Sequence, residues 1–251
     1  MKNTAITDLK HETREKFILK VSGLAKFFGG VRACDNLNFA LKKGDLHCIV
    51  GPNGAGKSTF FKILMGTIKA DKGTIFLNDE EITNMPTYMR ARKGLGIKFQ
   101  NMQVYSELTV FQNFFVPLRR HHKPSEMHDL VRDILLRINL EGFINHKVKN
   151  LSHGQQQWLS IGMSIALEPE LLLLDEPAAG MGPEETEETA EIIRSLNKEG
   201  MSILVIEHDM EFIKNLNTRT TVLHLGALFA EGSYEDIANH AGVRSIYLGK
   251  N

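Results

Sequence analysis

The segment GPNGAGKS at residues 51–58 lies between an apolar run at Leu46–Val50 and a stretch at 58–66 that favours a helix. It fits the pattern G-x-x-x-x-G-K-[ST], in which backbone N–H groups wrap around phosphate oxygens. Its glycines let the backbone approach these oxygens without a Cβ clash. We therefore expect a strand, a phosphate-binding loop and a helix whose N-terminus faces the phosphates.

Two side chains of this loop carry specific chemistry. Lys57 supplies a positive charge for the β- and γ-phosphates, and the Ser58 hydroxyl can ligate Mg²⁺. The alternative is a glycine turn before an unrelated helix, which the preceding strand and the following helix disfavour. The predicted nucleotide-binding residues of this segment are Gly51, Pro52, Asn53, Gly54, Ala55, Gly56, Lys57, Ser58 and Thr59.

A second segment, LLLLDE at 171–176, supplies carboxylates. The apolar run is typical of a parallel strand buried on both faces, and catalytic groups gather at the carboxyl ends of such strands. There Asp175 can hold Mg²⁺, and Glu176 can polarise the attacking water. Alternatively, Asp175 caps a turn and Glu176 is a surface charge. Together the two segments predict hydrolysis of a nucleoside triphosphate.

Short apolar runs alternate with helix-forming stretches along the chain. This alternation predicts an α/β fold with a parallel sheet covered by helices, interrupted by a helical insertion at about 101–167. Residues 1–16 are expected to form a flexible tail, 17–250 one domain, and 240–251 a short C-terminal tail. Strands are expected at 17–21, 36–41, Leu46–Val50, 74–77, 94–99, 171–174 and 203–206, helices at 58–66, 125–138, 155–167, 184–198 and Met210–Leu216, and a hairpin at 221–231.

Bulk composition narrows the classes of partner. The chain of 251 residues has 30 basic and 30 acidic residues, so charge gives no case for nucleic acid or anionic lipid as the main partner. Two cysteines do not make a disulfide framework and fit a reducing compartment. No apolar run approaches the ~18–20 residues of a membrane span. We therefore expect a soluble protein that reaches a membrane only through a partner.

The segment LSHGQ at 151–155 resembles the signature motif of ATP-binding cassette (ABC) proteins, usually written L-S-G-G-Q. It stands upstream of the carboxylate strand, as the family requires. Helix capping would explain Ser152 but not the whole set. On these three motifs the chain, over about 17–250, is identified as a member of the ABC proteins. The resemblance implies a P-loop NTPase (RecA-like) core with an antiparallel β subdomain and a helical subdomain that carries the signature motif, and ATP and Mg²⁺ as cofactors.

The resemblance also assigns roles to single residues. Phe28 matches the aromatic residue that stacks on adenine, although either it or Phe27 could instead be a buried core residue. Gln100 matches the glutamine that contacts Mg²⁺ and water and senses the membrane partner. His208 matches the histidine that contacts the γ-phosphate. Glu176, His208 and Gln100 are thus the expected catalytic residues, and Ser58, Gln100 and Asp175 the expected metal ligands.

The signature motif implies a dimer. In this family Ser152, Gly154 and Gln155 contact ATP that is bound to the opposite subunit, so two ATP molecules lie between two cassettes. The partner is a second copy or a paralogue. This chain departs from the family at His153, which replaces a glycine and should be accommodated if its side chain points away from phosphate. It also lacks the usual aspartate in the D-loop at 179–182, so communication between the two sites is expected to differ.

The segment EPAAGM at 176–181 resembles cassettes of branched-chain amino acid importers, whereas 152–158 and 181–187 look closest to the urea and short-amide subunit. This implies two membrane permeases as partners, a substrate-binding protein indirectly, no nucleic acid, and a peripheral location at the cytoplasmic face of the inner or plasma membrane. Residues 101–120 are expected either to help form the permease-binding groove or to be ordinary core. The alternatives are a soluble ABC ATPase without a transport role and the cassette of a lipid exporter.

Overall fold

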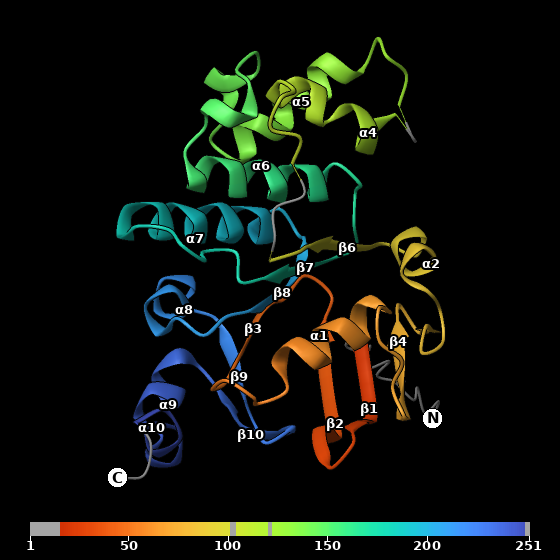
Figure 1. The fold of residues 1–251 in the computed structure, drawn as a ribbon, viewed down its shortest axis with the longest axis vertical. Coiled ribbons are helices and arrows are strands. Elements are labelled where there is room, and N and C mark those ends of the chain that lie inside the picture. The colour runs from red at the N-terminus through yellow and green to blue at the C-terminus, as the bar shows by residue number, and fades with distance from the viewer. Residues whose placement is uncertain (1–15, 101–103, 120–121, 249–251) are drawn as a thin grey trace, which may run out of the picture.

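The computed structural model describes residues 16–100, 104–119 and 122–248 and contains two β-sheets covered by helices (Figure 1). The tail predicted at 1–16 lies outside the described residues except for Lys16, and so do 101–103 and 120 of the predicted groove. Within the described ranges, no helix combines the length and apolarity needed to cross a bilayer.

The central sheet has six strands in the order β10-β9-β3-β8-β7-β6. Strands β6, β7, β8, β3 and β9 run parallel, and β10 pairs antiparallel with β9, so the predicted parallel sheet is confirmed. Its strands are β3 (Leu46–Val50), β6 (Leu95–Lys98), β7 (Leu171–Asp175), β8 (Ser202–Ile206), β9 (Arg219–His224) and β10 (Ala227–Gly232).

Alternate residues of the central strands belong to two different cores, because successive side chains of a strand point to opposite faces. Leu172 and Leu174 of β7 pack with residues of the helices, whereas Leu171 and Leu173 pack with α1 and the second sheet. Both faces of β7 are therefore buried, which explains its unbroken apolar sequence.

The second sheet is antiparallel, with the order β2-β1-β4-β5. Its strands are β1 (Phe17–Phe28), β2 (Val31–Lys42), β4 (Lys72–Leu77) and β5 (Glu80–Glu81). The predicted strands at 17–21 and 36–41 are therefore too short. The polar break at Ser22 and Gly23 looks like a turn, but Gly23 has a φ of 60°, and the pairing register shifts there without ending the strand.

The helices predicted at 58–66, 125–138 and 155–167 are found with bounds shifted by a few residues. An unpredicted helix, α2, is short and is held by Arg90, whose buried guanidinium donates to the Ile63 and Leu64 carbonyls at 2.6 and 2.7 Å. The helices up to β7 are α1 (Lys57–Met65), α2 (Thr87–Arg92), α3 (Val110–Asn113), α4 (Phe115–Leu118), α5 (Met127–Arg137), η1 (Glu141–Phe143), η2 (Val148–Asn150) and α6 (His153–Ile165).

The C-terminal part of the described chain contains a hairpin followed by helices. The hairpin of β9 and β10 is found, with its turn at Leu225 and Gly226. In the segment 240–251, predicted as a short C-terminal tail, residues 241–248 form a helix, and its Val243 is buried in the core. The helices after β7 are α7 (Pro183–Lys198), α8 (Met210–Leu216), α9 (Tyr234–Asn239) and α10 (Ala241–Leu248).

Candidate functional site

The residues predicted from separate motifs meet at one edge of the central sheet. The phosphate loop follows β3, Glu176 follows β7, and His208 follows β8, so all three lie at the carboxyl ends of neighbouring parallel strands. Gln100 comes two residues after β6, the edge strand beside β7. This edge is where open α/β sheets bind ligands.

The phosphate loop is clasped between two other strands. A Cβ on Gly51 would lie 2.3 Å from the carbonyl oxygen of Leu223 in β9. A Cβ on Gly56, whose φ is 101°, would lie 2.1 Å from the carbonyl oxygen of Ala33 in β2. Glycine is thus required at both positions to keep the loop this close to its neighbours.

Lys57 begins helix α1 and is largely buried. Its Nζ donates to the carbonyl oxygens of Gly51, at 2.5 Å, and Pro52, at 3.2 Å. Burial lowers the pKa of Lys57, while the nearby carboxylates of Glu176, Asp175 and Glu207 act in the opposite direction. The ammonium therefore lies in the loop, where phosphate oxygens could take the place of these carbonyls.

A cavity of about 320 Å³ opens at the phosphate loop and reaches Glu176. Phe28 lines it and is 47% exposed, whereas Phe27 is half-buried. The reading of Phe28 as a core residue is therefore wrong. Its ring is available to stack on a nucleobase. The described residues that line the cavity are Phe28, Val31, Ala33, Asn53, Gly54, Ala55, Gly56, Lys57, Ser58, Thr59 and Glu176.

Glu176 lies between two other predicted catalytic residues. The Gln100 amide nitrogen donates to Glu176 Oε2 at 2.7 Å, and His208 Nδ1 lies 3.3 Å from Glu176 Oε1. Glu176 also has a φ of 45°, an uncommon conformation for a residue with a side chain. A carboxylate held in this way can accept a proton from a water molecule.

Lys98, at the end of β6, is a site residue that sequence reasoning missed. It is only 1% exposed, and its Nζ points at the carbonyl oxygens of Asp175, at 3.4 Å, and Glu176, at 3.3 Å. Burial lowers its pKa to about 8. Burial and then the Glu176 charge raise the pKa of Asp175, while Lys98 acts in the opposite direction. The available signal was a lysine in an otherwise apolar strand.

Glu207 was also missed. It is 1% exposed and accepts hydrogen bonds from the backbone N–H groups of Ala178, at 3.2 Å, and His208, at 3.1 Å. Burial raises its pKa, and the two N–H donors act in the opposite direction. Glu207 thus joins the turn after β7 to the segment of His208. The feature of the sequence that could have indicated Glu207 is an acidic residue directly after the apolar run at Ile203–Ile206.

The donor set at this edge fits a magnesium ion that is shared with a nucleotide. Among the described residues, no group of three or more His, Cys, Asp and Glu could hold a metal ion. Asp175 and Ser58 offer a carboxylate and a hydroxyl, and Mg²⁺ commonly completes such a set with phosphates and water. Because the Gln100 nitrogen donates to Glu176, a metal contact from Gln100 would use its carbonyl oxygen.

The signature segment lies apart from the phosphate loop of its own chain. Ser152 caps α6 in a reciprocal pair with Gln155: the Gln155 N–H donates to Ser152 Oγ at 3.2 Å, and the Ser152 N–H to Gln155 Oε1 at 3.0 Å. Neither they nor Gly154 are among the described residues that line the phosphate-loop cavity. The ring of His153 lies against the turn after β7, with Nε2 3.0 Å from the Ala179 carbonyl oxygen.

An apolar groove of about 430 Å³ lies beside Gln100, between the end of β6 and the helical insertion. Phe99, Tyr105 and Val116 in it are exposed. The part of the segment 101–120 that is described thus contributes to a groove, while Val110, Phe114 and Leu118 are buried core residues. The described lining residues are Ile97, Phe99, Val104, Tyr105, Val116, Pro117, Ser160, Met163, Ser164 and Leu167.

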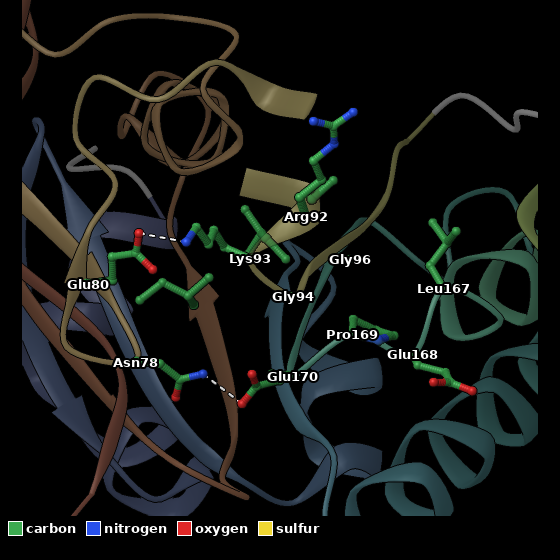
Figure 2. Close-up of a pocket in the computed structure, with 13 residues that line it drawn as sticks. Asn78, Glu80, Arg92, Lys93, Gly94, Gly96, Leu167, Glu168, Pro169 and Glu170 are labelled. Atoms are coloured by element: carbon green, nitrogen blue, oxygen red, sulfur yellow. Dashed lines mark hydrogen bonds and ion pairs between the residues drawn. The ribbon is translucent and has the colours of Figure 1, made fainter. Parts of the chain in front are cut away.

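A further cavity of about 490 Å³, shown in Figure 2, opens near the amino ends of β6 and β7. Its charged groups pair with their neighbours: Lys93 with Glu80 at 2.8 Å, and Glu170 with the Asn78 amide at 2.6 Å. The predicted site residues do not appear among the described residues that line it. It is therefore distinct from the candidate site at the carboxyl ends.

Comparisons with known proteins agree with this geometry. A family model described as ABC transporter matches residues 34–179. The high-affinity branched-chain amino acid transport ATP-binding protein LivG of Escherichia coli K12 is 36% identical over 250 residues, which cover 93% of this chain and 98% of LivG.

Two solved structures extend the comparison. The ADP conformation of MJ1267, an ATP-binding cassette of an ABC transporter, matches with a TM-score of 0.83 and 27% identity, covering 93% of this chain and 99% of that one. The dimeric cassette MJ0796, in a post-hydrolysis state with ADP and Pi, matches with a TM-score of 0.74 and 26% identity, covering 86% and 98%. The predicted P-loop NTPase fold is thereby confirmed.

Proposed function

Because this chain belongs to the ABC transporter family, we propose that it is the ATP-binding and ATP-hydrolysing subunit of a membrane importer. The observation that carries the proposal is the position of Glu176, held between Gln100 and His208 at the mouth of the phosphate loop. This arrangement provides a base for water beside a binding site for phosphates, which a nucleotide-binding module without turnover does not need.

The roles of the site residues follow from their positions. The backbone of 51–58 and Lys57 bind the phosphates, and Phe28 stacks on the adenine ring. Ser58, Asp175 and Gln100 would hold Mg²⁺, which when bound would neutralise phosphate charge. Glu176 accepts a proton from the attacking water, Gln100 orients the carboxylate, and His208 donates to the γ-phosphate. The positive charge of Lys98, which lies at the carbonyl oxygens of Asp175 and Glu176, offsets the negative charge of their two carboxylates.

Dimerisation completes each site in this proposal. Ser152, Gly154 and Gln155 lie at the N-terminus of α6, outside the phosphate-loop cavity of the same chain. The N-terminus of α6 and its helix dipole suit a γ-phosphate presented by a second subunit. The similarity to a cassette that was solved as a dimer with ADP and Pi supports this arrangement. The partner is a second copy or a paralogous cassette.

The apolar groove beside Gln100 is the proposed contact for the membrane permeases. Exposed Phe99, Tyr105 and Val116 give it the apolar character expected of a docking surface. A permease helix seated there would lie next to the residue that donates to Glu176, so docking could act directly on the base. We accordingly place the subunit at the cytoplasmic face of the membrane, held there through its permeases.

For the cargo we propose branched-chain amino acids, because LivG, which matches nearly the whole chain, is named for their transport. The segments at 152–158 and 181–187 favour urea and short amides instead. Since the cassette does not touch the cargo, its own contacts cannot separate the two. Transport by the complex decides between them.

The test is purification of the tagged chain with its membrane partners, followed by ATP-driven uptake in proteoliposomes. The importer is supported if two permeases are recovered and if the complex takes up leucine or urea in a reaction that Glu176→Gln abolishes. Recovery of ribosomes or nucleic acid would favour the soluble ABC ATPase, and ATP-driven lipid movement the exporter cassette. Either result would reject the importer.

A further inference from the structure

His153 stands where the signature motif usually has glycine, and its side chain makes a specific contact. Its Nε2 lies 3.0 Å from the carbonyl oxygen of Ala179. A carbonyl can only accept, so Nε2 carries the proton and donates it. The neighbouring Gly180, with a φ of 77°, fits closely, since a Cβ there would lie 3.2 Å from the same Nε2. The ring is thus seated against the turn at 179–180.

That turn is attached directly to the proposed base. The Ala179 N–H donates to the Glu176 carbonyl oxygen at 3.3 Å, and the Ala178 N–H donates to buried Glu207 at 3.2 Å. Displacement of Ala179 would therefore be transmitted to the backbone of Glu176 through one short turn. His153 joins the start of α6 to the segment whose first residue is Glu176.

A second contact ties the same helix start to α7. Ser152 Oγ donates to Glu185 Oε1 at 2.9 Å, and a Cβ on Gly154 would lie 2.6 Å from that oxygen. A serine hydroxyl has one proton, so Ser152 cannot donate to Glu185 and to a phosphate at the same time. When it binds a partner's ATP, it must release Glu185. The His153 contact with Ala179 does not use the Ser152 hydroxyl, so it can persist in both states.

We propose that His153 is a positioning residue that couples the signature segment of a subunit to Glu176 of the same subunit, and thereby links the two ATP sites of the dimer. Binding of the partner's ATP at Ser152 shifts the start of α6, and His153 passes this shift to the turn at Ala179. The histidine does so in a chain whose D-loop at 179–182 has no aspartate. This inference rests on the proposed function, because it needs two ATP molecules shared between two subunits.

Mixed dimers test this coupling. They are assembled from two differently tagged copies, or from this chain and the cassette that co-purifies with it. In the cis dimer, one subunit carries His153→Ala and keeps Glu176. The other subunit has its proposed catalytic base substituted, by Glu176→Gln in a second copy of this chain. In the trans dimer, His153→Ala and Glu176→Gln are in one subunit, and the other subunit keeps its base. The reference dimers lack the His153 substitution.

The expected result is slower ATP hydrolysis in the cis dimer, by roughly three- to tenfold for one lost hydrogen bond, and an unchanged rate in the trans dimer. His153→Gln, which keeps an N–H donor, should restore the cis rate, whereas His153→Phe should not. His146→Ala, which removes an exposed histidine of the same helical insertion, is the matched control and should have no effect in either dimer.

Amide hydrogen exchange gives a readout that does not depend on turnover. ATP-driven dimers with both bases substituted should gain protection at 178–182, and His153→Ala should remove that gain while ATP affinity of the single subunit is unchanged. A slower rate of ATP hydrolysis in the trans dimer, or an unchanged rate in the cis dimer, would overturn the coupling but not the proposed function. Reference dimers that fail to hydrolyse ATP would overturn the proposed function as well.

Discussion

The amide nitrogen of Gln100 donates to Oε2 of Glu176 at 2.7 Å, although 76 residues separate the two in the sequence. They meet because β6 and β7 are parallel neighbours and both end at the same edge of the sheet. Gln100 also follows Phe99, which lines the apolar groove. The proposed base is therefore one hydrogen bond away from the surface that we assign to the permeases.

Substitution of Glu176 by Gln should leave ATP binding intact and abolish turnover. The amide keeps the size of the side chain but cannot accept a proton, so the rate of hydrolysis should fall by about 10²–10⁴-fold. Steady-state phosphate release measures this, and size-exclusion chromatography should show a dimer trapped by ATP. Glu184→Gln, an exposed carboxylate of α7, is the control. Near-normal turnover in Glu176→Gln would remove Glu176 as the base.

Substitution of Phe28 by Ala should weaken ATP binding without a change in the hydrolysis rate at saturation. Loss of one stacking contact is worth about 0.5–1.5 kcal/mol, or roughly two- to tenfold in Kd. Binding of a fluorescent ATP analogue measures the change, and Phe28→Tyr should retain the affinity. Phe229→Ala, an exposed aromatic of β10, serves as the control. Equal affinity of Phe28→Ala and the parent would show that the Phe28 ring does not contact the adenine ring.

Gly56→Ala should abolish nucleotide binding, whereas Gly182→Ala should be tolerated. At Gly56 the new methyl group would lie 2.1 Å from the Ala33 carbonyl oxygen, so the loop and β2 must separate. At Gly182 the new methyl group would have no contact within 4 Å among the described residues, and the backbone is extended. We expect Gly56→Ala to lower the free energy of unfolding by at least about 2 kcal/mol, measured by urea denaturation. Normal ATP binding by Gly56→Ala would contradict the clasped loop.

Motifs with local chemistry could be predicted from the sequence, and contacts between distant segments could not. The phosphate loop and the buried strand β7 can each be recognised from a few consecutive residues. Lys98 and Glu207 were missed, because a charged residue at or just after the end of a short strand resembles a surface residue until the fold buries it. Strand β1 was cut short because Gly23 looks like a turn, yet the β2 and β4 partners hold the strand together through the bulge.

The same limit applies to His153 and Glu185. The sequence showed His153 as a departure from the signature pattern, but its acceptor on Ala179 depends on how α6 packs near the turn after β7. Glu185 lies in the first turn of α7, where any acidic residue complements the helix dipole. Its hydrogen bond to Ser152 arises from tertiary packing of α6 on α7, which the local pattern does not encode.

Tyr247→Phe should leave the protein as stable as the parent or slightly more stable. The Tyr247 hydroxyl is buried, and it has no hydrogen-bond partner among the described residues. Burial raises its pKa to about 12, against a smaller opposing effect of the Gly51 backbone. Removal of an unsatisfied buried hydroxyl should raise the free energy of unfolding by up to about 1 kcal/mol, seen as a higher Tm.

The control for this substitution is Tyr88→Phe, because Tyr88 is exposed and its hydroxyl is solvated. That variant should unfold at the temperature of the parent. A clear loss of stability in Tyr247→Phe, with Tyr88→Phe unaffected, would show that the Tyr247 hydroxyl has a partner, and the backbone of Gly51 would be the first candidate.

His47 should make the protein less stable as the pH falls from about 6.5 to about 4. It is 3% exposed in β3, with Nε2 2.8 Å from the Thr221 hydroxyl. Burial lowers its pKa from 6.5 to about 4; Glu231 opposes this and Arg219 adds to it. Between these values the unfolded chain binds more protons than the folded one, so stability rises with pH. The contribution is fully present above pH 6.5 and is lost as the pH falls through 4.

Urea denaturation between pH 4 and pH 8 measures this effect. A shift from 6.5 to about 4 corresponds to about 3 kcal/mol, since one pKa unit is worth about 1.4 kcal/mol. His47→Gln removes the titrating group, so its free energy of unfolding should change less with pH over this interval, even if the variant is less stable at pH 7. His146→Gln, at an exposed position, should keep the slope of the parent. Parallel curves for His47→Gln and the parent would mean that His47 has the same pKa in the folded and the unfolded protein, and that its burial beside Thr221 does not hold it neutral.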